Sequence, residues 1–156
     1  MPKSDTRSRT IARNRRARFN FSLEKSFQAG LVLEGWELKS IRAGKVQLVD
    51  TYVIIRDNEA YLLGARINPL PSASTHHVPQ PDRTRKLLLN RRELREISVA
   101  LQVKGKSCVA TSMYWSQQYV KCEIAIATGK RAYDKRKTIQ EREWNRQKER
   151  LRKQVV

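Results

Sequence analysis

Positive charge is concentrated at the two ends of this chain, and this pattern limits where a compact core can form. Residues 1–18 contain seven lysines and arginines against Asp5 alone, and residues 129–156 contain eleven basic residues against four acidic ones. The whole chain carries a net charge of +18, of which the long middle segment contributes only +5. Because like charges oppose compaction, we expect one folded domain in the middle, flanked by two basic ends.

An excess of this size is more than solubility requires, and it favours a polyanionic partner. Nucleic acid is the first candidate and an anionic membrane the second. No stretch approaches the roughly 18 apolar residues of a membrane span, and the basic first twenty residues do not resemble a secretory signal. The sequence therefore predicts a cytoplasmic nucleic-acid-binding protein with no membrane partner.

The cysteines and histidines do not have the spacing of a familiar metal site. Cys108 and Cys122 are far apart in sequence, and the only histidines, His76 and His77, are adjacent. Four zinc ligands cannot be assembled from them in a known pattern. We expect two buried free thiols, no metal ion and no cofactor.

Short apolar runs separated by turn residues predict several antiparallel strands. The runs 52–55 and 61–63 flank an Asp-Asn pair and predict a hairpin. A second hairpin is predicted from 108–115 and 119–127, with alternation that places Lys121, Glu123 and Ala125 on the wet face. Further strands are predicted at 31–33 and 86–89.

Two short helices and one long loop interrupt these strands. The segment Gly35–Arg42 predicts a helix ended by Gly44 in a left-handed conformation. Asn90 and Glu93 form a capping-box pattern before an amphipathic helix that ends near Gly105. The proline-rich segment 69–82 predicts a loop.

The fold class that fits these elements is mainly β: a small antiparallel barrel, closed or nearly so, of about six strands with two or three short helices. Oligonucleotide-binding barrels are one such architecture with RNA ligands. The expected organisation is a flexible basic N-terminus over 1–12, a barrel over 13–129 and a basic tail over 130–156.

The tail is expected to be disordered in the free protein. Arg142, Arg146 and Arg150 would form one basic stripe on a helix, and like charges at this spacing oppose helix formation. Ile139, Trp144 and Leu151 do not share one face, and a short helix without packing is marginal in water. Trp144 has no use in a purely solubilising tail, so we expect the tail to become ordered on RNA.

Several strings, in order along the chain, resemble the small protein B family. They are residues 11–18, 28–30, 35–45, 83–90 and 129–136. The resemblance implies an oligonucleotide-binding-type barrel that binds the tRNA-like domain of transfer-messenger RNA (tmRNA) and brings it to stalled ribosomes. It also implies a tail in the decoding region and mRNA path of the small subunit, indirect contact with elongation factor Tu through the RNA, and no covalent chemistry.

The resemblance assigns residues to two surfaces. The residues implied to bind tmRNA are Asn14, Arg15, Arg18, Gln28, Glu37, Lys39, Arg83, Arg85, Lys86, Leu88 and Lys121. The residues implied to act on the ribosome are Lys130, Arg131, Tyr133, Asp134, Lys135, Arg136, Ile139, Arg142, Trp144, Arg146, Arg150 and Leu151. Two positions depart from the family pattern, because Gln28 stands where glutamate is common and Tyr133 where histidine is common. Trp36 is expected in the core and Leu88 on the surface.

Two other classes of function are compatible with parts of the sequence. A barrel protein of ribosome assembly or initiation would have the same composition, and only the family strings distinguish it. A nuclease is disfavoured, because the carboxylates are scattered among basic residues rather than clustered for a two-metal site.

Overall fold

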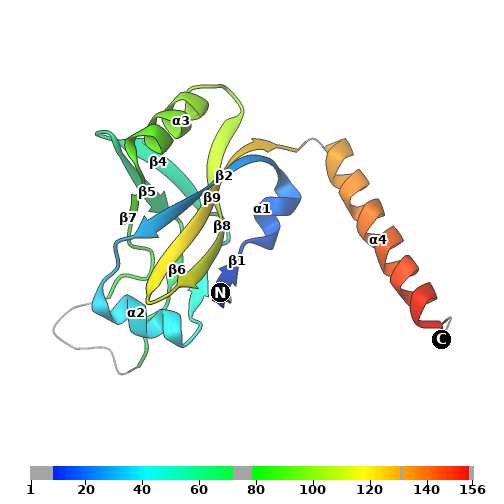
Figure 1. The fold of residues 1–156 in the computed structure, drawn as a ribbon, viewed down its shortest axis with the longest axis horizontal. Coiled ribbons are helices and arrows are strands. Elements are labelled where there is room, and N and C mark those ends of the chain that lie inside the picture. The colour runs from blue at the N-terminus through cyan, green and yellow to red at the C-terminus, as the bar shows by residue number, and fades with distance from the viewer. Residues whose placement is uncertain (1–8, 72–78, 131, 155–156) are drawn as a thin grey trace, which may run out of the picture.

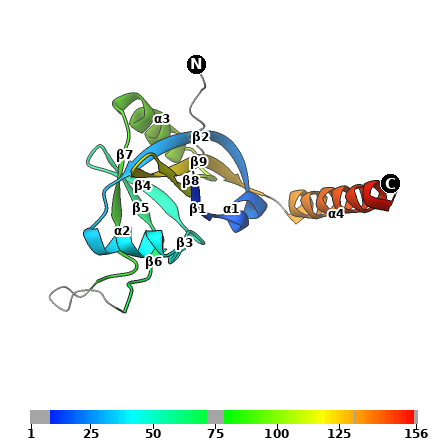
Figure 2. The same ribbon diagram turned by 60° about the horizontal axis from the view of Figure 1, so that its bottom comes forward.

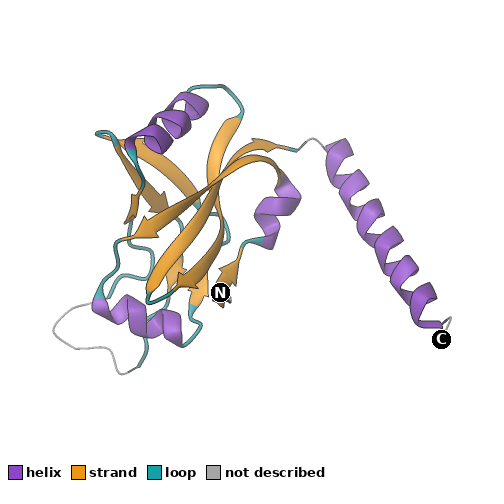
Figure 3. Cartoon of the chain, viewed as in Figure 1, coloured by secondary structure: helices purple, strands orange, loops and turns teal. Residues whose placement is uncertain are grey.

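The computed structural model describes residues 9–71, 79–130 and 132–154, which form nine strands and four helices (Figures 1 and 3). The strands are β1 (Arg9–Arg13), β2 (Phe21–Leu31), β3 (Val46–Gln47), β4 (Tyr52–Arg56), β5 (Glu59–Leu63), β6 (Arg66–Ile67), β7 (Arg85–Leu88), β8 (Lys106–Ser116) and β9 (Tyr119–Gly129). The helices are α1 (Arg15–Asn20), α2 (Gly35–Arg42), α3 (Arg91–Leu101) and α4 (Ala132–Gln154).

Seven strands form one curved antiparallel sheet in the order β1-β8-β9-β2-β7-β5-β4, and β3 and β6 form a separate pair. The sheet folds over itself, so that β4 lies against β8. Within the described residues no ladder joins the edge strands β1 and β4, and the barrel is therefore not closed. The mainly β, antiparallel fold is confirmed. It has more strands than expected, because β1, β3 and β6 are too short or too basic to show the apolar alternation from which strands were predicted.

The main core fills the inside of the curved sheet, with α2 and α3 placed against different ends of it (Figure 2). Its largest fully buried apolar side chains are Leu48, Leu62, Ile67, Leu87, Ile97, Met113 and Ile124. Each such side chain contributes about 1.5–3 kcal/mol relative to an exposed position. Ile97 is the only fully buried residue of α3, so the amphipathic pattern of this helix has placed its apolar face on the sheet.

The local signals for α2 and α3 are confirmed. Gly44 follows α2 with φ of 73°, a left-handed conformation that glycine adopts without a Cβ penalty. At α3, the Asn90 side chain accepts from Glu93 N at 2.9 Å, and the Glu93 carboxylate accepts from Asn90 N at 3.3 Å. Both capping-box hydrogen bonds are therefore present.

Both predicted hairpins are also confirmed. Asp57 and Asn58, at φ of 50° and 61°, make the turn between β4 and β5. The β8–β9 hairpin places Cys108 and Cys122 in the core as free thiols. Burial raises the pKa of each thiol to about 12.

The expected flexible segment 1–12 is wrong for its last four residues. Arg9–Arg13 forms β1, which pairs with β8, and Ile11 and Ala12 pack against the main core. The long edge of β8 offers unpaired backbone groups that β1 satisfies. Residues 1–8 lie outside the described residues.

Helix α1 was not expected as a separate element. It follows β1 directly and packs Ala17 against Val109 and Ala127 in a small second cluster, which Phe21 and Leu23 flank. This packing covers part of the outer face of β9. Ala125, which was expected on the wet face, is buried instead and pairs with Val109 of this cluster in the β8–β9 ladder.

The expected disordered tail is also wrong in this structure, because residues 132–154 form the helix α4. Neither glycine nor proline occurs in this segment, and lysine, arginine, glutamate and glutamine dominate it. These are strong helix formers, and Glu149 with Lys153 adds a favourable i, i+4 pair. Intrinsic propensity therefore outweighs the repulsion within the arginine stripe.

The loop predicted over 69–82 lacks helix and strand at 69–71 and 79–82, the parts that the structure describes. His76 and His77 lie outside the described residues. Among the helices described, none has the length and apolar character needed to cross a membrane.

Candidate nucleic-acid interface

The outer face of the sheet carries two parallel rows of side chains across strands β1, β8, β9, β2 and β7. In one row the register aligns Tyr114 with Lys121, Lys121 with Gly30, and Gly30 with Leu88. In the next, Arg13 lies beside Ser112, Ser112 beside Glu123, and Glu123 beside Gln28. We call these two rows, together with Arg18 of α1, the sheet face.

The sheet face is hollowed where α1 meets it. An open depression of about 500 Å³ is lined by Thr10, Arg13, Arg18, Gln28, Ser112, Tyr114 and Glu123. Its lining is polar and includes two guanidinium groups. A depression with this lining suits an anionic, hydrogen-bonding ligand better than an apolar one.

Hydrogen bonds within the depression hold its polar side chains in place. The Tyr114 hydroxyl donates to the Gln28 side-chain oxygen, and the Ser112 hydroxyl donates to Glu123 at 3.2 Å. Burial, and then the charge of Glu123, raise the pKa of Tyr114, so the phenol stays protonated and can donate. Gln28 keeps its amide N–H₂ group for a ligand.

Gly30 leaves a gap in the first row between Lys121 and Leu88. Leu88 is 53% exposed, as expected, and an added Cβ at Gly30 would lie 3.2 Å from the Leu88 Cβ. The absence of a side chain at Gly30 therefore lets Leu88 lean over the strand. The result is an exposed apolar side chain in the same row as the Lys121 ammonium group, where it can contact the face of an unstacked base.

Other expected RNA-binding residues lie outside the depression. Arg15 is exposed on α1, and Lys39 is exposed on α2. Lys86 shares the outer side of β7 with Leu88 and forms an ion pair with Glu59 at 3.4 Å. Lys121 is half-buried between its strand neighbours.

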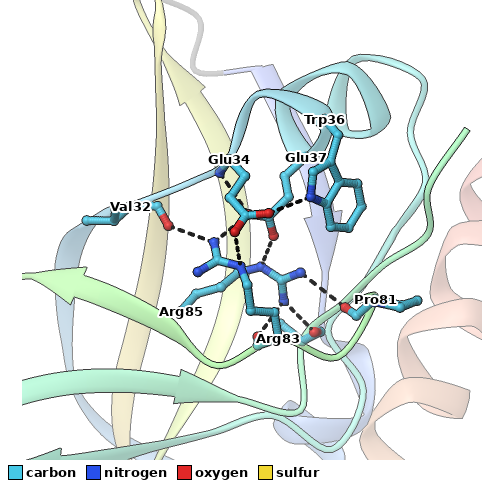
Figure 4. A network of polar contacts seen from close by, with 8 residues as sticks. Val32, Glu34, Trp36, Glu37, Pro81, Arg83 and Arg85 are labelled. Carbon is cyan, nitrogen blue, oxygen red and sulfur yellow. Dashed lines mark hydrogen bonds and ion pairs between the residues drawn. The ribbon is translucent and has the colours of Figure 1, made fainter. Parts of the chain in front are cut away.

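Glu37 and Arg85, which the resemblance assigned to RNA, are buried side chains with a structural role (Figure 4). The Arg85 guanidinium donates to the Glu37 carboxylate and to the backbone oxygens of Ala65, Arg83 and Pro81 at 2.8, 3.0 and 3.1 Å. Burial lowers the pKa of Arg85, and the hydrogen bond with Glu37 opposes this effect. The assignment of these two residues to the RNA surface is therefore corrected.

Arg83 belongs to the same network and lies at its solvent-facing edge. Its guanidinium donates to the Glu37 carboxylate and to Val32 O at 3.3 Å, and its side chain is 26% exposed. Trp36, half-buried against the core as expected, donates its indole N–H to Glu34 at 2.6 Å. Arg83 can reach a ligand only with the part of its fork that the network leaves exposed.

Asn14 is the third RNA assignment that the structure corrects. It is 3% exposed, and its side-chain N–H₂ donates to Leu48 O and Ala110 O at 2.8 and 2.9 Å. Its side-chain oxygen accepts from Ala17 N at 3.1 Å and caps α1. Asparagine suits this position because its side-chain amide has both donors and an acceptor, so it can bond to two backbone oxygens and cap α1 at the same time.

The tail residues are mostly exposed along α4. Ile139, Trp144 and Leu151 are 43%, 58% and 61% exposed. Four arginines of the helix are exposed: Arg136, Arg142, Arg146 and Arg150. Lys130 and Lys135 are half-buried near α1. Arg131 and the side chains of Tyr133 and Asp134 lie outside the described residues.

Five residues of the depression were not assigned to RNA from the sequence: Thr10, Arg13, Ser112, Tyr114 and Glu123. Tyr114 could have been found, because the two-residue turn at Gln117 and Gln118 fixes the register that pairs Tyr114 with Lys121. Glu123 was placed on the wet face but not assigned to RNA. Arg13 depends on β1, which carried no strand signal among its basic neighbours.

No metal centre accompanies this surface in the described part of the chain, where no three His, Cys, Asp or Glu side chains are grouped to hold an ion. The side chains of the sheet face themselves offer hydrogen bonding, positive charge for phosphates and an apolar contact at Leu88.

Comparisons with known proteins connect this chain to one family. The family model described as SmpB protein matches residues 11–154. An SsrA-binding protein of Marinomonas sp. (strain MWYL1) is 55% identical over 151 residues, covering 97% of this chain and 95% of the relative. An SsrA-binding protein of Alcanivorax borkumensis is 54% identical over 152 residues, covering 97% of this chain and 96% of the relative.

A solved structure has a similar fold. It comes from work named "tmRNA-SmpB: a journey to the center of the bacterial ribosome", and the matched chain has a TM-score of 0.66 at 36% identity. The match covers 78% of this chain and 85% of that chain.

Proposed function

Because the chain belongs to the SmpB family, we propose that it is an RNA-binding adaptor that binds tmRNA and brings it to stalled ribosomes in trans-translation. The observation that carries this proposal is the similarity to SsrA-binding proteins along nearly the whole chain. The chain's own part is recognition and delivery, with no covalent step. Its place of action is the cytoplasm, where ribosomes work.

The sheet face supports binding of the tRNA-like domain of this RNA. Arg13, Arg18 and Lys121 supply charges for phosphates. Tyr114 and Gln28 supply hydrogen-bonding groups suited to base edges and 2′-hydroxyls, and Leu88 supplies an apolar surface for a base. A folded RNA presents all these groups, whereas a regular duplex hides most base edges from side chains.

Helix α4 supports a separate role on the ribosome. Arg142, Arg146 and Arg150 recur every four residues and form one basic stripe, while the side chains of Trp144 and Leu151 are largely exposed. Ribosomal RNA in the decoding region and mRNA path would neutralise the stripe and cover the apolar side chains.

A pair of lysine variants tests the first surface. Lys121→Ala should weaken binding of tmRNA and lower the salt slope of the binding constant by about 1, because one phosphate contact is lost. Lys104→Ala, at an exposed position in the α3–β8 loop, is the matched control and should leave both unchanged. Equal effects of the two variants would show that the sheet face is not the binding surface.

A truncation tests the division of roles. A chain ending at Gly129 should bind tmRNA nearly as well as the full chain and should fail to support tagging of nascent chains. Loss of RNA binding equal to the loss of tagging would contradict this division. Sequencing of RNA that co-purifies with the full chain separates this function from a role in ribosome assembly or initiation, which would enrich ribosomal RNA without tmRNA.

A further inference from the structure

We propose that Gln28 and Glu123 together recognise the Watson–Crick edge of an unpaired guanine base in the bound RNA. The two residues are direct cross-strand neighbours on β2 and β9, and both side chains line the depression of the sheet face. We call them the recognition pair. The proposal deepens the function proposed above and rests on it, because it takes the sheet face to be an RNA surface.

Glu123 is a carboxylate within a depression that otherwise suits an anion. The guanidinium groups of Arg13 and Arg18 line the same depression. Within the described residues, no lysine or arginine forms an ion pair with Glu123, so the protein does not neutralise its charge through such a contact. A carboxylate repels phosphates and only accepts hydrogen bonds, so an RNA group that lies against it has to be a donor.

The neighbouring strand holds this carboxylate in place. A bulge in β8 between Ala110 and Ser112 shifts the register, so that Ser112 lies directly opposite Glu123. The Ser112 hydroxyl donates to Glu123 Oε2 at 3.2 Å, and the Thr111 hydroxyl donates to the Glu123 backbone oxygen at 3.1 Å. Bulges of this kind re-aim side chains beside functional sites. Since Ser112 uses one lone pair of Oε2, both carboxylate oxygens can still accept from a ligand.

Gln28 presents the complementary group. The Tyr114 hydroxyl donates to the Gln28 side-chain oxygen, which leaves the amide N–H₂ group to donate to a ligand. Directly opposite residues in an antiparallel pair have Cβ atoms about 4.5–5.5 Å apart, a spacing comparable with the width of a base edge. The recognition pair therefore offers a neutral donor and a charged acceptor side by side.

Guanine is the base whose edge fits this pair best. Its O6 accepts while N1–H and the N2 amino group donate, so Gln28 can donate to O6 and Glu123 can accept from both N–H groups. Adenine and cytosine offer one amino group beside a ring acceptor, which gives one bond to each side chain. Uracil has a carbonyl on either side of its single N–H, and one of them would face the carboxylate. The guanine has to be unpaired, because base pairing would occupy the same edge.

Binding of short hairpin RNAs to the full chain tests the recognition pair. The RNAs share one stem and a loop of uridines with one guanosine, and matched RNAs carry inosine, 7-deazaguanosine or 2′-deoxyguanosine at that position. Inosine lacks the N2 amino group and should bind about five- to tenfold more weakly, the effect of one lost hydrogen bond. The other two analogues keep the Watson–Crick edge and should bind like guanosine.

Glu123→Gln should abolish the preference for guanosine over inosine, because an amide cannot accept from both N–H groups. The ratio of the two dissociation constants is the readout, since removing a charge near phosphates also changes the overall affinity. Glu96→Gln makes the same chemical change on α3, outside the depression, and should keep the preference. Both variants should melt at the temperature of the parent chain.

Three results would overturn the proposal. The first is equal binding of the guanosine and inosine hairpins by the parent chain, and the second is an unchanged preference in Glu123→Gln. The third is weakened binding of the 2′-deoxyguanosine hairpin alone, which would show that the ribose hydroxyl is the donor.

Failure of the proposed function would appear in a different measurement. A parent chain that does not capture tmRNA from total RNA would overturn that function, whereas its preference among the hairpins would still report on the recognition pair. A parent chain that captures tmRNA but does not distinguish guanosine from inosine would keep the function and reject the pair.

Discussion

The Glu37 carboxylate and the Arg85 guanidinium are fully buried, and each is the other's charged partner. Glu37→Gln removes the negative charge and leaves Arg85 buried without compensation. We expect the free energy of unfolding to fall by about 3 kcal/mol. Urea denaturation measures this change.

Glu34→Gln is the matched control for this prediction. Glu34 and Glu37 both form an ion pair with Arg83. The Glu34 side chain is 52% exposed, so water screens its charge. The expected loss is about 0.5 kcal/mol or less. Similar losses for the two variants would mean that burial of the Glu37 charge is not what makes the pair important.

The two cysteines lead to a prediction about pH. Because the pKa of each buried thiol is raised from an ordinary value near 9 to about 12, the folded state keeps protons that the unfolded state loses between these values. Their contribution to stability is therefore complete below pH 9 and falls as the pH rises toward 12. Iodoacetamide at pH 8 should leave the native thiols unmodified and label them after unfolding in urea, whereas the exposed thiol of Gln102→Cys should react at once. Rapid labelling of the native protein would contradict this account.

At single positions the sequence predicted the surface better than the interior. Strand alternation placed Lys121 on the wet face, and the family resemblance favoured an exposed Leu88. Leu88 is exposed, and Lys121 is half-buried in the same outer row. Arg85 and Glu37 could not be recognised as buried, because an ion pair within the core depends on two elements that are 48 positions apart. Asn14 was read as a polar surface residue, yet its partners come from distant loops and strands.

At the level of elements, local signals were sufficient wherever a cap or a tight turn was present. Asn90 with Glu93, Gly44, and the Asp57-Asn58 turn each predicted an element that the structure contains. The long strand β2 was mostly missed, because a register shift between Leu23 and Lys25 interrupts its alternation. Short strands such as β3 depend on pairing rather than on their own residues.

Helix α4 was missed because the repulsion within the arginine stripe was weighed more heavily than the intrinsic helix propensity of its residues. Since its stability rests on this propensity, Gln147→Pro should break the helix by removing a hydrogen bond and clashing with the preceding turn. Circular dichroism should show lost helix with an unchanged thermal transition of the barrel, and tagging should fall. Gln147→Ala should leave both unchanged; an unaltered spectrum for the proline variant would contradict the presence of this helix in solution.

At the scale of the molecule, the basic ends now belong to defined structures. The first includes β1 and α1 beside the depression, and the second is largely α4, which extends away from the barrel. Charge alone thus favoured a nucleic-acid-binding protein, whereas the tmRNA partner came from the family resemblance. The curvature that brings Arg13, Gln28 and Tyr114 together required the sheet itself.

This arrangement predicts how the tmRNA binding constant of the full chain and of a truncated chain depends on salt. Binding of tmRNA by the full chain should weaken by orders of magnitude between low and moderate salt, since each neutralised phosphate contributes a slope of about 0.7–0.9. A chain ending at Gly129 should show a slope that is only slightly smaller, because the sheet face remains. A flat response for the full chain, or a slope that collapses on truncation, would contradict this assignment of charge to function.

The small cluster beneath α1 has a consequence for local unfolding. Ala17, Val109 and Ala127 bury α1 separately from the main core, so opening this helix exposes much less apolar surface than unfolding the barrel. Since the Arg18 side chain lines the depression, the same opening event would also disrupt the depression. Amide hydrogens of α1 should therefore exchange earlier than those of β8 and β9, and bound RNA should slow this exchange. A helix of six residues would then act as a cooperative unit whose stability is set by the ligand.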